Sequence, residues 1–302
     1  MPEPFLYLQA IGAAAVISVF IVLLTARLRP TNAPWWNSAG VLGMAAGFAM
    51  GCRAINLRLA WPPANGLDRL LLIVLPLTCL VELIAGIPSV SRVFAWSLRI
   101  GLSIAIPRIL LHGSVYRGET ADRWTSLKTA TELATSSVFL ISSWALLFRL
   151  SQRSLGIPVA LSIGLSTCCA GLCTMLAGYL KGGAVAFPFA VALVASTLAA
   201  KVMTNRDGTP STAIIGVGVV GLFGWLFIGH FYGRLPTEAT FALFLSPTLC
   251  WIAVTPPMQR RNAWHRGLLC LAIVSIPLMF VLTSAKQAFD RDMAPLLQRE
   301  RF

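Results

Sequence analysis

The sequence is built from a succession of apolar runs, each about 20 residues long, separated by short polar turns. A run of this length crosses the hydrocarbon core of a bilayer as an α-helix. The first, Phe5–Ala26, holds no charged residue and ends at Arg27. Because a helix satisfies its own backbone hydrogen bonds in lipid, a chain with many such runs is restricted to a bundle of membrane-spanning helices.

The runs predict an all-α fold, a polytopic transmembrane helical bundle of about ten spans. Nine or eleven spans also fit, because the second and fourth segments are the least certain. The expected spans are Phe5–Ala26, Trp36–Cys52, Leu67–Ile87, Arg92–Leu111, Leu133–Leu150, Ile157–Leu180, Ala184–Met203, Ser211–Phe231, Glu238–Thr255 and Arg266–Ser284.

The composition leaves little room for anything outside the membrane. Hydrophobic residues make up 57% of the chain and charged residues 12%, against about 25% charged in a soluble domain. We expect residues 1–302 to form a single integral membrane domain with no sizeable soluble domain. Two polar segments stand out: 112–132, predicted to lie at the interface, and 286–302, predicted to be a charged amphipathic tail.

The net charge is +13, from 24 basic and 11 acidic residues. Arg and Lys lie mainly at the ends of the apolar runs, where long basic side chains reach the phosphate headgroups. We therefore expect anionic lipid headgroups as partners, and no nucleic acid. The localisation predicted is the cell membrane (the inner membrane in a bacterium). The basic residues divide almost evenly between the two sides, so they do not choose an orientation.

A charged side chain at membrane depth is costly and is a functional candidate by default. Glu82 is the only carboxylate well inside a predicted span, and Arg99 lies at a similar depth in the next one. The pair is a candidate intramembrane charge pair, either as an ion pair that fixes the hairpin or as part of a transport or proton path. Arg92 and Arg99, seven residues apart, are candidate contacts for an anionic lipid or substrate headgroup; a surface-lying segment or plain snorkelling explains them as well.

Small residues recur at a helical spacing in the second segment. Gly43, Gly47 and Gly51 form a doubled small-xxx-small pattern, which lets another helix approach closely. We predict a helix-packing face at these three positions.

The sequence carries no catalytic, phosphate-binding or metal-binding motif. We therefore predict no cofactor and no metal. His112, His230 and His265 all fall at span ends, where they are interpreted as interfacial side chains. The cluster of His112, Tyr116, Glu119 and Asp122 in a polar loop is the one arrangement that suits a lipid-modifying enzyme.

Three functions stay open at this stage. The first is a permease-like transporter of a small solute or lipid, supported by the number of spans, the short loops and the prolines within them. The second is a non-catalytic membrane subunit or scaffold that packs against partner membrane subunits. The third is a lipid-modifying membrane enzyme, although the lack of a catalytic motif argues against an enzyme.

Overall fold

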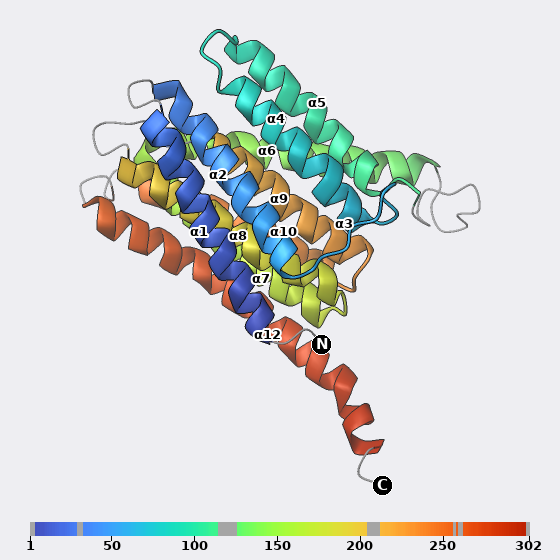
Figure 1. Cartoon of the computed structure of the whole chain (residues 1–302). Helices are drawn as coiled ribbons and strands as arrows, with labels where there is room; N and C mark the ends of the chain where they lie inside the picture. The colour runs from blue at the N-terminus through green and yellow to red at the C-terminus, as the bar shows by residue number, and fades with distance from the viewer. Residues whose placement is uncertain are drawn as a thin grey trace.

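The protein is described by a computed structural model that covers residues 4–28, 33–113, 126–203, 212–255, 258 and 262–299. The described residues contain no strand, and their helices pack side by side in a bundle (Figure 1). The prediction of an all-α helical bundle is confirmed. The elements are α1 (Pro4–Leu28), α2 (Ala33–Ala54), α3 (Gly66–Arg69), η1 (Leu70–Val74), α4 (Leu75–Ala85), α5 (Arg92–Leu110), α6 (Ser126–Leu150), η2 (Ser151–Leu155), α7 (Gly156–Leu176), α8 (Leu180–Met203), α9 (Thr212–Phe231), α10 (Thr237–Leu245), η3 (Ser246–Val254) and α12 (Ala263–Arg299).

Eight helical segments of the described chain, rather than about ten, are long and apolar enough to cross a membrane. The uncertain fourth segment, α5, is among them. The second segment, α2, falls short because Asn37, Arg53 and several glycines dilute its apolar residues. The stretch α3–η1–α4 carries three charged residues, Asp68, Arg69 and Glu82. The eight apolar helices make the chain a multi-pass membrane protein.

The helix α9 lies inside the bundle, in contact with α2, α4, α6, α7, α8 and α10. Its sequence is apolar on every side, which is typical of a helix surrounded by others. The rings of Phe48, Phe189 and Trp225 join α2, α8 and α9, with centroids 4.6–6.1 Å apart. The indole Nε1 of Trp225 donates a hydrogen bond to the Gly182 carbonyl oxygen at 3.0 Å, which satisfies the one polar atom of a buried side chain.

The glycines of α2 lie where α1 and α8 come closest to it. A Cβ atom on Gly43 would lie 2.6 Å from Val22 Cγ2, and one on Gly47 would lie 2.5 Å from the Ala14 carbonyl oxygen. A Cβ on Gly51 would lie 2.5 Å from Pro188 Cβ in α8. The structure therefore places the three predicted packing glycines against neighbouring helices of the same chain.

The structure describes part of each of the two polar segments. Residues 126–132, expected in an interfacial segment, form the first turns of α6, and residues 114–125 lie outside the described part. The tail from 286 to 299 is helical and continues α12 past the end of the bundle (Figure 1). The last predicted span ends at Ser284 because the apolar run ends there. The helix itself continues, since helical backbone does not need apolar side chains.

The contact between α1 and α2 predicts that Gly47→Ala destabilises the protein. The added Cβ meets the backbone of α1, and such overpacking costs about 1–3 kcal/mol. Gly12→Ala on α1 is the matched control: no atom lies within 4 Å of its Cβ, so we expect a gain of about 0.5–1 kcal/mol from helix propensity. Thermal unfolding of the two variants in detergent measures both effects. Equal unfolding temperatures for the two variants would contradict this close packing.

Candidate functional site

Glu82 and Arg99 form an ion pair inside the bundle. Arg99 Nε donates to Glu82 Oε1 at 2.7 Å, and Arg99 Nη2 donates to Glu82 Oε2 at 2.8 Å. The two residues are 1% and 5% exposed, respectively. The structure thus brings together the two residues that the sequence placed at similar depth. Two parallel charge-assisted hydrogen bonds hold the guanidinium and carboxylate in one plane and in one register.

Neighbouring helices close around this ion pair. The Arg99 guanidinium lies over the rings of Trp96 and Phe148, 5.2 and 4.5 Å from their centroids. On the other side, a Cβ on Gly216 of α9 would lie 2.5 Å from Glu82 Oε1 and 3.0 Å from the Trp144 ring. Cation–π contacts and a glycine at the closest approach leave no room for a substrate beside the carboxylate. The pair holds α4 and α5 against α6 and α9.

Arg92 does not join Arg99 in a shared basic face. Arg92 is the first residue of α5 and is exposed, whereas Arg99 is buried and already paired with Glu82. The structure therefore separates the two arginines that the sequence grouped as contacts for an anionic headgroup. Only Arg92 remains accessible to one.

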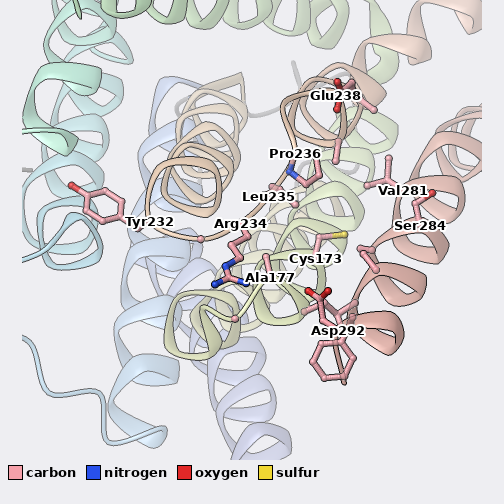
Figure 2. A pocket seen from close by; sticks show the side chains of 18 of the residues that line it. Cys173, Ala177, Tyr232, Arg234, Leu235, Pro236, Glu238, Val281, Ser284 and Asp292 are labelled. Carbon is pink, nitrogen blue, oxygen red and sulfur yellow. The ribbon is translucent and has the colours of Figure 1, made fainter. Parts of the chain in front are cut away.

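A cavity of about 960 Å³ lies away from the Glu82–Arg99 pair, between α7, the loop after α9, α10 and α12 (Figure 2). Its walls are mainly apolar, and they include Cys173, Leu176, Ala242, Phe280 and Val281. Three charged residues also line it: Arg234, Glu238 and Asp292. Cavities of this size, with apolar walls and few polar groups, are the usual form of small-molecule sites.

The loop that carries Arg234 is held in place by the end of α9. The N–H of Leu235 donates to the Gly229 carbonyl oxygen at 3.2 Å, and His230 Nδ1 lies 2.9 Å from the Leu235 carbonyl oxygen. Leu235 is buried, while Arg234 is exposed. In the sequence, Gly233–Pro236 is one of the short turns between apolar runs, and Asp292 is one charge of the tail 286–302. No local signal relates residues 58 positions apart, so the cavity was missed.

A second buried carboxylate, Asp68, was also missed. Asp68 is 3% exposed, and its Oδ2 has no hydrogen-bond partner. Its backbone N–H is capped by Asn65 Oδ1 at 2.8 Å, which starts α3. Burial raises the pKa of the nearby Tyr179 hydroxyl, and the charges of Asp68 and then of Tyr232 raise it further. The signal in the sequence was an acidic residue in the first turn of a predicted span, which normally implies only a favourable helix dipole.

The histidines do not gather into one site. His112 and His265 are exposed, and His230 contacts the loop after α9. The other members of the proposed catalytic loop, Tyr116, Glu119 and Asp122, lie outside the described residues. In the part of the chain that the structure describes, no three His, Cys, Asp or Glu side chains are grouped to hold a metal ion.

The buried pair predicts a strong coupling between Glu82 and Arg99. Glu82→Gln leaves the Arg99 guanidinium without a counter-charge in the bundle core, and Arg99→Met leaves the Glu82 carboxylate without one. Each single variant should lower the free energy of unfolding by about 3–5 kcal/mol. The double variant removes both charges and should lose less stability than the sum of the two single variants. A double-mutant cycle of thermal unfolding measures the difference. Additive losses would mean that the two side chains do not depend on one another.

No protein-family model matches the chain, and no curated protein matches it either. The Glu82–Arg99 pair is buried among side chains, whereas the cavity beside α12 is open and large enough for a small molecule. The cavity is the candidate functional site of this membrane protein.

Proposed function

We propose that the protein is a permease-like transporter of the cell membrane, and that it carries an amphipathic small molecule or lipid through the cavity between α7, α10 and α12. The observation that carries the proposal is the cavity itself. Its volume of about 960 Å³ is at the upper end of the range for small-molecule sites. Its mixture of apolar walls and charged residues suits a molecule that has both an apolar and a polar part.

The position of the cavity supports entry from the bilayer. Phe280 lines the cavity and is 74% exposed, so the apolar side of the cavity reaches the surface of the bundle. Neighbouring side chains on the same face of α12, among them Ile276 and Met279, are also exposed and apolar. A ligand that is dissolved in the lipid can reach such an opening without first passing through water.

A non-catalytic scaffold is less well supported than the transporter. A small-residue helix face can pack against a helix of a partner subunit or against a helix of the same chain. Gly43 and Gly47 pack against α1 and Gly51 against α8, so these faces are already used within the chain. The lipid-modifying enzyme rests on a loop outside the described residues, and nothing in the described part adds to it.

Transport can be measured with the full chain reconstituted in liposomes. A fluorescent lysophospholipid is placed in both leaflets, and a membrane-impermeant quencher reports how fast the inner pool moves outward. We expect exchange that is faster than in protein-free liposomes. Ala288→Trp, which places a large ring at a lining position, should slow this exchange more than tenfold because it narrows the cavity.

Gln287→Trp is the matched control, since Gln287 is exposed on the same helix but does not line the cavity. It should exchange the lipid as the unmodified chain does. Ser284→Trp provides a second blocked position in case Ala288→Trp is poorly folded. Exchange equal to that of protein-free liposomes, or equal exchange by all four proteins, would refute the transporter. A stoichiometric protein partner in native mass spectrometry, together with no exchange, would favour the scaffold instead.

A further inference from the structure

The cavity is elongated along α12. The lining residues of this helix recur on one face, from Phe280 through Ser284 and Ala288 to Asp292. At 1.5 Å per residue this face is about 18 Å long. One leaflet of a bilayer has a hydrocarbon depth of about 15 Å, half of the full core. The cavity therefore has the length of a lipid acyl chain together with the beginning of its headgroup.

Asp292 and Arg234 mark the polar end of the cavity. Asp292 is the last lining residue of α12 and lies eight residues beyond Ser284, where the long apolar run of that helix ends. Figure 2 shows Arg234, from the loop after α9, and Asp292, from α12, on opposite walls, with Glu238 at the other end of the view. Both side chains are exposed, and among the described residues neither takes part in an ion pair. The two opposite charges face a common space from different elements.

The third charge, Glu238, has a local explanation. Glu238 lies in the first turn of α10, two residues after Pro236, and its side chain is exposed. A carboxylate at that position is stabilised by the unpaired N–H groups at the start of the helix. The recognition of a headgroup is therefore attributed to Arg234 and Asp292.

We infer that the cavity binds a zwitterionic phospholipid, with the phosphate at Arg234 and the ammonium group at Asp292; that this lipid is also carried rests on the proposed function. A guanidinium binds a phosphate through two parallel hydrogen bonds, and a carboxylate accepts hydrogen bonds from an ammonium group. An anionic headgroup such as phosphoglycerol carries no positive charge, so Asp292 would face uncharged hydroxyl groups and would repel the net negative charge of the lipid. A cationic amphiphile would meet Arg234 in the same way. Only a headgroup with both charges matches both walls.

The test compares two lysophospholipids with the same acyl chain, lysophosphatidylethanolamine and lysophosphatidylglycerol. Binding to the purified full chain is titrated by native mass spectrometry from a nonionic detergent. We expect the zwitterionic lipid to bind at least tenfold more tightly than the anionic one. Arg234→Gln should weaken both lipids by about tenfold or more, because each loses its phosphate contact.

Asp292→Asn separates recognition from folding. It should weaken binding of the zwitterionic lipid and strengthen binding of the anionic one, because the carboxylate attracts the ammonium group of the first and repels the net negative charge of the second. A variant that is merely unstable would weaken both. Asp290→Asn and Arg291→Gln are matched controls, since both residues are exposed on α12 next to Asp292 and do not line the cavity. These controls should keep the affinities and the ratio of the unmodified chain.

Equal affinity of the unmodified chain for the two lipids, or an unchanged ratio in Asp292→Asn, would overturn the inference. So would a change in the controls as large as that in Arg234→Gln and Asp292→Asn. The outcome is separable from that of the transport experiment. Selective binding without lipid exchange would remove the transporter and leave the lipid site, whereas exchange blocked by Ala288→Trp but faster for the anionic lipid would remove the zwitterionic site and leave the transporter.

Discussion

The close approach of four neighbouring segments to the buried helix α9 is the constraint on which the bundle depends. Between membrane helices there is no hydrophobic driving force, so association relies on close packing and on small residues that permit it. The glycines of α9 are distributed around the helix, and each one receives a different side chain. The pairs are Gly216 with Glu82, Gly218 with Leu193, Gly221 with Phe189, Gly224 with Leu70 and Gly229 with Thr174. A single helix thus organises α4, η1, α7 and α8.

This packing also explains how a charge pair is tolerated in the core. A carboxylate and a guanidinium removed from water lose several kcal/mol of hydration each, and only good geometry offsets that loss. Gly216 lets the Glu82 carboxylate lie directly against α9, while Trp96 and Phe148 cover the guanidinium of Arg99. Beyond any effect on stability, the pair fixes the register of α4 against α5. A shift of one helix along the other would separate two buried charges.

The features that could be predicted from the sequence are those set by local pattern or by a short connection. Gly43, Gly47 and Gly51 repeat at a helical spacing, so their packing role follows from one segment alone. Glu82 and Arg99 lie on either side of a tight turn, so equal depth could be counted from that turn. The features that were missed depend on tertiary placement. Asp68 is buried near Tyr179, far from it in the chain, and Arg234 and Asp292 line one cavity only because α12 continues as a helix past Ser284.

The distribution of packing also determines where in the bundle there is space for a ligand. The charged pair, the aromatic cluster around Trp225 and the glycines of α9 all lie in the interior, where opening a space would break several contacts at once. The helix α12 is different, because it contacts the bundle through α7, α10 and η3 on one face and leaves large side chains such as Phe280 exposed on the other. A densely packed interior beside a peripheral helix therefore suits the proposed lipid site, because a ligand bound along α12 would leave the charge pair and the packing around Trp225 intact.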